Sequence, residues 1–287
     1  MSERKGGLIS NESFYKQCLT NPDVHIGSRE VMNHTTHYYD KGDEKIKIGK
    51  ILFCDILYNI FEEIITNAVD LAIKSRLNDW KGSKVTLIRV TVDDESIEIY
   101  NNGAGFQVDK GPYVKSITDG EFYYEPDAAF TIQHTSSNYE AKNTKDISFC
   151  GGKNGIGAKA AFVYSDLLMI KTQNNGVYYE NTYALVDKNL VEPRVVRDEC
   201  VIKKGQKGEN FTSVKFYPSF DFMSKTTMNS IMSLIQRRVR ETSMIIHDGS
   251  LKVILNGETH NTGFIDFTKK YITRPNIQVI YHEFVKI

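Results

Sequence analysis

The sequence lacks net charge, because its 36 lysine and arginine residues equal its 36 aspartate and glutamate residues. A dedicated nucleic-acid-binding module carries an excess of basic residues, so we expect any DNA partner to be gripped elsewhere. The sequence also lacks an apolar run long enough to span a bilayer, and no apolar signal core follows its polar N-terminus. These absences predict a protein that is neither secreted nor inserted in a membrane.

Cysteine is scarce and dispersed. The four cysteines, Cys18, Cys54, Cys150 and Cys200, lie far apart and form no CxxC pair. This spacing favours reduced thiols in an intracellular protein over a disulfide framework or a zinc site. Internal repeats and low-complexity tracts are also missing, and 287 residues with 40% hydrophobic content suffice for one large domain.

Hydrophobic periodicity predicts a mixture of helices and strands. The expected helices lie near residues 13–19, 51–77, 226–246 and 264–271, and the expected strands near 84–92, 96–100, 167–172, 176–186, 199–203, 211–216 and 251–255. Residues 41–50 are charged and contain glycine, which predicts an exposed loop. Arg237, Arg238 and Arg240 predict a solvated helix face. A last strand at 277–281 has no predicted partner, so we expect the chain to stop early in a further domain.

The stretch from Phe61 to Leu71 predicts an amphipathic helix with an unusual polar face. Glu63, Asn67 and Asp70 recur at positions i, i+4 and i+7, so their side chains lie close enough to share a ligand. An ordinary solvated helix that contains an asparagine is the alternative explanation for this stretch alone.

Two glycine-rich segments follow that helix. Residues 101–105 (NNGAG) come directly after a predicted hairpin, and their glycines allow the backbone to approach a flat ligand, although a plain glycine turn is the alternative. Residues 151–159 lead into an apolar helix, an arrangement that cradles anions. A Walker loop is excluded because Ala158 and Lys159 replace its Gly-Lys-Ser/Thr ending. A dinucleotide fingerprint is excluded because residues 107–146 predict a lid instead of a strand.

Together and in this order, the motifs resemble the ATPase module of the GHKL superfamily, and most of all that of eukaryotic-type type IIA DNA topoisomerases. The segments that carry the resemblance are 21–28 (NPDVHIGS), which resembles RPDTYIGS; 57–70, which resembles LYKIFDEILVNAAD; 101–105, which resembles NNGKG; 135–139 (TSSNY), which resembles TSSNY; and 151–159 (GGKNGIGAK), which resembles GGRNGYGAK. The resemblance covers roughly residues 15–270, nearly the whole chain.

The resemblance implies an α+β fold of the GHKL (Bergerat) type, a two-layer sandwich in which helices cover one face of a mixed β-sheet. It divides the chain into three parts. Residues 1–12 form a flexible N-terminal arm that is exchanged between the subunits of a dimer, 13–265 form an ATPase domain, and 266–287 form the truncated start of a transducer domain. In the family a transducer lysine reaches the γ-phosphate. These residues end before such a lysine, so we expect weak hydrolysis from them alone.

The resemblance also implies the site residues. Glu63 corresponds to the base that activates the attacking water, and Lys159 is the second catalytic residue. Asn67 matches the Mg²⁺ ligand, Asp70 a residue that acts through water, and Asn102 the residue at the adenine edge. The remaining implied ATP contacts are Ser136, Ser137, Asn138, Gly152, Lys153, Asn154, Gly155, Ile156, Gly157, Ala158, Lys159 and Thr212.

The function implied by the resemblance is Mg²⁺-dependent binding and hydrolysis of ATP. Nucleotide would induce homodimerisation and close an N-terminal gate, through which the full-length DNA topoisomerase passes duplex DNA. No membrane partner is expected. The expected location is intracellular: the nucleus, or the cytoplasm or a virus factory if the source is viral.

Three alternatives remain open at this point. A chaperone-type GHKL ATPase that does not act on DNA would share the fold, but is expected to carry Asp in place of Asn102. A histidine kinase would need a phospho-acceptor helix before Ile51, and no such helix is predicted. An inactive nucleotide-binding relic is disfavoured, because Glu63, Asn67 and Lys159 are all present.

Overall fold

The computed structural model describes residues 14–77, 79–116, 120–132, 157–188, 194–223, 226–246, 249–261 and 263–271. The helices are α1 (Phe14–Thr20), α2 (Pro22–His25), α3 (Asp55–Lys74), α4 (Glu125–Thr131), α5 (Gly157–Val163), the 3₁₀ turn η2 (Met228–Ile231), α6 (Met232–Met244) and α7 (Phe264–Lys270). The strands are β1 (Val31–Asp40), β2 (Lys45–Cys54), β3 (Leu87–Val92), β4 (Ile97–Asn102), β5 (Val114–Lys115), β6 (Phe122–Tyr123), β7 (Ser165–Asn174), β8 (Val177–Val186), β9 (Arg194–Arg197), β10 (Val201–Lys204), β11 (Phe211–Pro218), β12 (Lys252–Leu255) and β13 (Glu258–His260).

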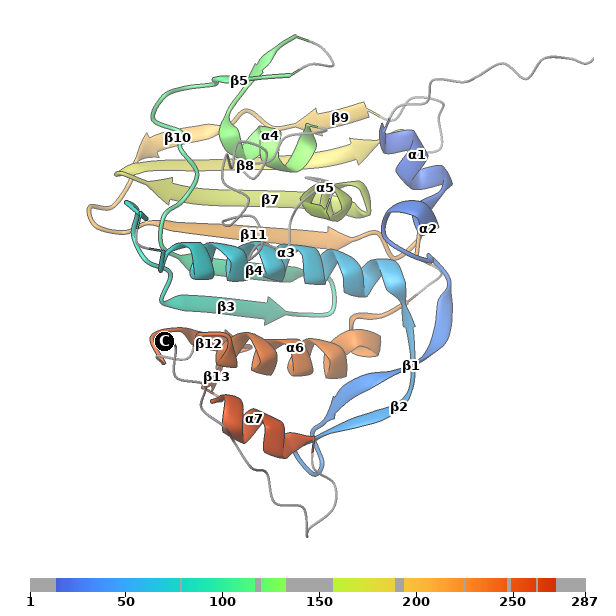
Figure 1. The fold of residues 1–287 in the computed structure, drawn as a ribbon. Coiled ribbons are helices and arrows are strands. Elements are labelled where there is room, and N and C mark those ends of the chain that lie inside the picture. Colours follow the sequence, from blue (N-terminus) through green and yellow to red (C-terminus); the bar gives the residue numbers. More distant parts are fainter. Residues whose placement is uncertain are drawn as a thin grey trace, which may run out of the picture.

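A mixed sheet forms one layer of the molecule (Figure 1). Within the described ranges it has nine strands in the order β10-β8-β7-β11-β4-β3-β12-β13, with β9 also paired to β8. Its neighbouring strands are antiparallel except β12 and β3, which run parallel. A parallel partner requires a crossover connection, and here β12 enters the sheet after the helix α6.

The second layer consists of helices that lie across one face of this sheet, with α3 and α6 running side by side and α5 beyond α3 (Figure 1). The apolar side of α3 repeats at helical period, and Ile60, Ile64 and Ala68 are buried there. They share one core with Ile88 of β3 and Ile99 of β4. Each of these isoleucine side chains stabilises the fold by roughly 1.5–3 kcal/mol when buried. The predicted α+β architecture with helices on one face is therefore confirmed.

The prediction of an exposed loop at residues 41–50 is wrong. Most of this segment belongs to β2, which pairs with β1 in a long antiparallel hairpin, and only 41–44 form the turn. The hairpin packs one side on α6 and exposes the middle of β2, including Ile48 and Lys50. The lysines and glycine of this segment made the strand resemble a loop in sequence.

The prediction of a solvated face for the arginines of α6 is also wrong. The side chains of Arg237 and Arg238 are only 17% and 15% exposed, and Arg240 is buried. They face α3 and the β1–β2 hairpin. Arg238 pairs with Glu62, Arg237 donates to Tyr58, and Arg240 stacks on Tyr39. A charged helix stripe looks the same in sequence whether it meets water or opposite charges on another element.

The remaining predicted elements agree with the structure to within a few residues, apart from η2 at the start of the long helix predicted near 226–246. The elements α2, β1, β5, β6, α4 and β9 were not predicted, and three of them (β5, β6 and α4) lie within the lid predicted at 107–146. The strand expected at 277–281 lies outside the described residues, as does the arm at 1–12. In the part of the chain that the structure describes, no helix is both long and apolar enough to cross a bilayer.

Candidate functional site

The carboxylate of Glu63 lies against the first residue of α5. A Cβ atom built on Gly157 would stand only 1.7 Å from Oε2 of Glu63, so any side chain at 157 would displace that carboxylate. The amphipathic pattern of α3 directs Glu63 away from the core and towards this point. The structure thus brings together the acidic helix and the end of the glycine-rich segment, two motifs that are 94 residues apart in sequence (Gly157 and Glu63 in the printed numbering).

The two predicted catalytic groups are both perturbed by burial. Burial raises the pKa of the Glu63 carboxyl above its usual value, and the negative charges of Glu62 and Asp70 raise it further. Burial lowers the pKa of Lys159 to about 8. Raised carboxyl and lowered ammonium pKa values are typical of functional sites, because they bring both groups nearer to neutral pH.

Lys159 points towards the end of α4. Its Nζ donates a hydrogen bond to the carbonyl oxygen of Ala129, 2.8 Å away, and the residue is 1% exposed. Gly157 and Ala158, which precede it in α5, are half-buried. Of the three described residues of the predicted anion cradle, Gly157 therefore lies against Glu63, whereas the lysine is tied to α4.

A cavity of about 450 Å³ opens beside Glu63. Its lining includes Glu62 and Asn59 of α3 and the chain from Asp23 to Gly27. Asn59 joins the two sides, because its Nδ2 donates to the carbonyl oxygen of Ile26 at 2.6 Å. Glu63 therefore lines a cavity on the α2 side of the molecule and also contacts α5.

A row of polar side chains lies across three neighbouring strands at one end of the sheet's apolar, helix-covered face. Thr212 on β11 pairs with Thr172 on β7 and with Asn101 on β4, and the two threonine hydroxyl oxygens are 3.3 Å apart. Gly105 lies at this row, since a Cβ atom there would stand 2.5 Å from Oγ1 of Thr172. The glycine thus allows the backbone of the loop after β4 to pass directly over Thr172.

Asn102, the residue predicted at the adenine edge, has its side chain engaged elsewhere. Its Oδ1 accepts hydrogen bonds from the backbone N–H groups of Thr86 and Leu87, both at 2.8 Å, and its Nδ2 donates to Oγ1 of Thr86. Successive strand residues face opposite sides of a sheet, so Asn101 shares the helix-covered side with Ile99 while Asn102 does not. Asn101 was not among the predicted site residues, although the alternation of β4 places it on the helix-covered side.

The structure places Asn67 and Asp70 on α3 beyond Glu63. Asn67 is exposed, whereas Asp70 is buried. Among the described residues, no three His, Cys, Asp or Glu side chains are grouped to hold a metal ion. Mg²⁺ is commonly held by one or two protein oxygens together with phosphate oxygens and water, so the Asn67 amide fits an ion that arrives with a polyphosphate.

Several predicted ATP contacts lie outside the described residues, namely Ser136, Ser137, Asn138, Gly152, Lys153, Asn154, Gly155 and Ile156. The described neighbours of that segment are α4 before it and α5 after it. The Lys159 to Ala129 hydrogen bond holds these two helices together.

Comparison with known proteins finds homologues along nearly the whole chain. No family model matches the sequence. DNA topoisomerase 2 of Arabidopsis thaliana is 30% identical over 280 residues, which are 94% of this chain, and DNA topoisomerase 2-alpha of Homo sapiens is 30% identical over 269 residues, 92% of this chain. The chain spans only 17% and 16% of the length of these relatives. Because these relatives are DNA topoisomerases, the chaperone-type GHKL ATPase is not favoured as an alternative.

Solved structures agree with the sequence relatives. The ATPase and transducer domains of DNA topoisomerase II from Balamuthia mandrillaris superpose with a TM-score of 0.75 at 25% identity, covering 94% of this chain and 64% of that one. The ATPase region of Saccharomyces cerevisiae topoisomerase II also gives 0.75 at 25% identity, with 91% and 64% covered. The gyrase B ATPase domain of Thermus thermophilus, at 0.57 and 17% identity, shares the fold. The chain is therefore homologous to eukaryotic DNA topoisomerase 2, and its fold is that of the ATPase domain of type II topoisomerases.

Proposed function

We propose that the chain binds ATP with Mg²⁺ and hydrolyses it, with Glu63 as the general base. The observation that carries the proposal is the contact between the Glu63 carboxylate and Gly157 at the start of α5. A carboxylate on a rigid helix, next to the end of an anion cradle, can orient a water in line with a terminal phosphate and accept its proton. Burial of Glu63 favours this role, because it raises the proton affinity of the carboxylate.

Other residues of the chain bind and orient in this proposal. Asn67 supplies one oxygen to Mg²⁺, and the bound ion neutralises phosphate charge. Asp70 acts through a water, and Asn101, in place of Asn102, presents its amide to the base edge beside Thr212. The polar row and Gly105 support this assignment, because they leave a polar end to an otherwise apolar face.

The segment between α4 and α5 completes the proposed site. Ser136, Ser137 and Asn138 contact the ribose and phosphates, and residues 152–156 with Gly157 and Ala158 form the cradle. Lys159 follows Ala158 in α5 and is held by its hydrogen bond to Ala129 of α4.

The proposal extends to the larger enzyme. Residues 1–12 act as an arm that crosses to a second subunit, 13–265 as the ATPase domain, and 266–287 as the start of a transducer. Nucleotide then induces a homodimer that closes a gate, and the full-length protein passes duplex DNA through it. An enzyme that acts on genomic DNA works inside the cell, in the nucleus or in a viral factory. The relatives named DNA topoisomerase 2 support this extension.

The test is steady-state ATP hydrolysis by the full-length protein and by its Glu63→Gln variant, with binding of a non-hydrolysable ATP analogue measured in parallel. We expect Glu63→Gln to lose roughly 100-fold or more in kcat, the range for a general base, and to retain analogue binding. Hydrolysis by Glu63→Gln at the wild-type rate would show that another residue activates the water.

A further inference from the structure

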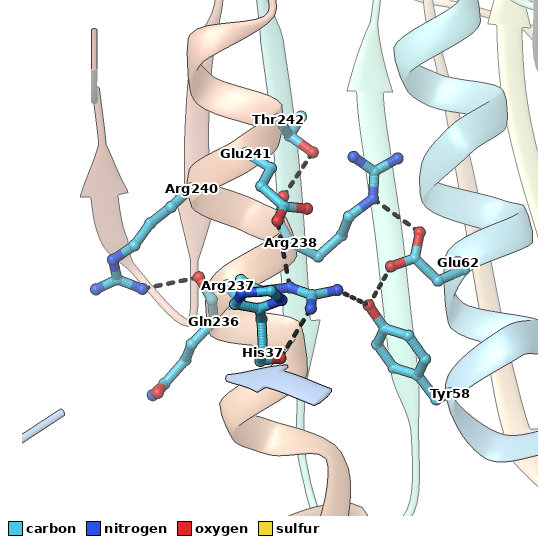
Figure 2. A network of polar contacts seen from close by, with 9 residues as sticks. All are labelled: His37, Tyr58, Glu62, Gln236, Arg237, Arg238, Arg240, Glu241 and Thr242. Carbon is cyan, nitrogen blue, oxygen red and sulfur yellow. Dashed lines mark hydrogen bonds and ion pairs between the residues drawn. The ribbon is translucent and has the colours of Figure 1, made fainter. Parts of the chain in front are cut away.

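A charged network joins the helix that carries Glu63 to α6 (Figure 2). Nε of Arg238 donates to Oε2 of Glu62 at 2.8 Å, and its Nη2 donates to Oγ1 of Thr66 at 3.3 Å. Nη2 of Arg237 donates to the hydroxyl of Tyr58 at 3.2 Å, and that hydroxyl donates to Oε1 of Glu62. Two adjacent arginines thus hold three successive turns of α3.

The α3 residues in this network form one stripe of the helix. Tyr58, Glu62 and Thr66 are each four residues apart, so their side chains lie above one another. The stripe displaced by one residue contains Asn59, Glu63 and Asn67. Consecutive helix residues are rotated by about 100°, so fixing the first stripe against α6 sets the direction of the second.

The arginine pair is itself held from the other side. Nη1 of Arg237 donates to the carbonyl oxygen of His37 in β1 at 2.8 Å, and its Nε lies 3.2 Å from Oε1 of Glu241. The side chains of Arg238 and Glu62 are 15% and 25% exposed, so this ion pair is largely removed from solvent screening. Replacing one partner of such a pair leaves the other charge buried without compensation.

We infer that Arg238 is a positioning residue for Glu63. Its hydrogen bonds to Glu62 and Thr66, which precede and follow Glu63 in α3, fix the rotation of α3 that directs the Glu63 carboxylate towards Gly157. The inference rests on the proposed function, because it takes Glu63 as the base. Arg238 contacts no nucleotide in this role and acts only through the position of Glu63.

The test compares Arg238→Gln and Arg238→Lys with a matched control, Arg240→Gln, in the full-length protein. Arg240 lies on the same helix and is buried, but its Nη1 donates to the carbonyl oxygen of Gln236 within α6 and its guanidinium stacks 3.5 Å from the centre of the Tyr39 ring. None of these contacts reaches α3. Four quantities are measured for each variant: kcat, KM for ATP, the dissociation constant of a non-hydrolysable ATP analogue, and the thermal unfolding midpoint.

We expect Arg238→Gln to lower kcat by about 10- to 100-fold with analogue affinity changed by less than about threefold, because small displacements of a catalytic group cost rate before binding. The kcat of Arg238→Lys should lie between that of Arg238→Gln and that of wild type, since an ammonium keeps the charge near Glu62 but cannot bridge to Thr66. Arg240→Gln should lower the unfolding midpoint and keep kcat within about twofold of wild type.

Two outcomes would overturn the inference. One is a folded Arg238→Gln protein with wild-type kcat, and the other is a loss of kcat in Arg240→Gln equal to that in Arg238→Gln. If Arg238→Gln does not fold, Arg238→Lys and Glu62→Gln decide, because the first keeps a long cationic side chain and the second keeps the size of the carboxylate side chain. Wild-type kcat in both variants contradicts the inference. Glu63→Gln is assayed alongside. If Glu63→Gln hydrolyses ATP normally, the proposed function fails. If Glu63→Gln is inactive while the Arg238 variants remain active, only the positioning role of Arg238 is refuted.

Discussion

The ammonium of Lys159 in α5 donates a hydrogen bond to the backbone carbonyl of Ala129 in α4, with 2.8 Å between the two atoms. These helices flank residues 133–156, which contain the predicted lid contacts. The bond therefore ties together the two helices that flank that segment. It also gives the lysine a structural contact that its assignment as a catalytic residue did not include.

Replacing Lys159 by Met separates these two roles. Methionine keeps the length of the side chain but removes its charge and its hydrogen bond. Losing the hydrogen bond destabilises the fold, but the variant no longer buries a charge, which stabilises it. We therefore expect the free energy of unfolding to change by less than about 2 kcal/mol. If the lysine also serves the phosphates, the affinity for ATP should fall about tenfold or more. Calorimetric titration with an ATP analogue and urea unfolding measure both. A protein destabilised by several kcal/mol that binds the analogue normally would leave only the structural role.

Replacing Gly157 by Ala tests the contact on which the proposed function depends. The new methyl group would stand 1.7 Å from Oε2 of Glu63, and the end of that flexible side chain can turn away while the helices stay in place. We therefore expect a folded protein whose kcat is reduced roughly 100-fold, as for loss of a general base. Gly263→Ala is the control, because a Cβ atom there meets no atom within 4 Å. Normal turnover in Gly157→Ala would contradict the proposed geometry.

Asn101 and Asn102 are expected to respond differently to alanine. Asn102→Ala removes three hydrogen bonds to Thr86 and Leu87, so it should lower the free energy of unfolding by about 1–3 kcal/mol and leave ATP-analogue affinity nearly unchanged. Asn101→Ala should lower the affinity for the ATP analogue by about tenfold, as expected for the loss of one hydrogen bond to the ligand. Thermal unfolding and titration calorimetry give both quantities. The reverse pattern would return the adenine contact to Asn102.

The sequence predicted the elements whose pattern is local. The helix around Glu63 and the hairpin of β12 and β13 follow from periodicity and from the Asn256-Gly257 turn, which need no knowledge of distant contacts. Features that depend on partners far away in the chain were missed. Arg238 meets Glu62, 176 residues earlier, and only that partner distinguishes its buried position from a solvated one.

The site divides in the same way. Glu63 and Asn67 were predicted from the family resemblance, and their spacing places both on the polar face of one helix. The neighbouring asparagines of β4 were not distinguished, although Ile97 and Ile99 define the buried side of that strand and place Asn101 on it. The β1–β2 hairpin was missed because the charged residues of β2 obscure its alternation.

The ionisation of Glu63 predicts a pH-dependent effect on stability. The pKa of this carboxyl is raised in the folded protein, through burial first and then the charges of Glu62 and Asp70. The folded state therefore holds its proton more tightly than the unfolded state. The stability contributed by the protonated group is fully present below the ordinary value of 4.5 and is lost as the pH rises through the raised folded value.

Glu63→Gln removes this ionisation and keeps the shape of the side chain. We expect the variant to unfold at higher urea concentration than wild type at neutral pH, with the difference disappearing near pH 4. Glu180→Gln is the control of opposite sign, because a hydrogen bond from Tyr178 and the charge of Lys171 lower the pKa of Glu180. That variant should be less stable than wild type at neutral pH. A Glu63→Gln protein less stable than wild type at neutral pH would show that the carboxylate stabilises the fold, contrary to the cost expected of a buried catalytic base.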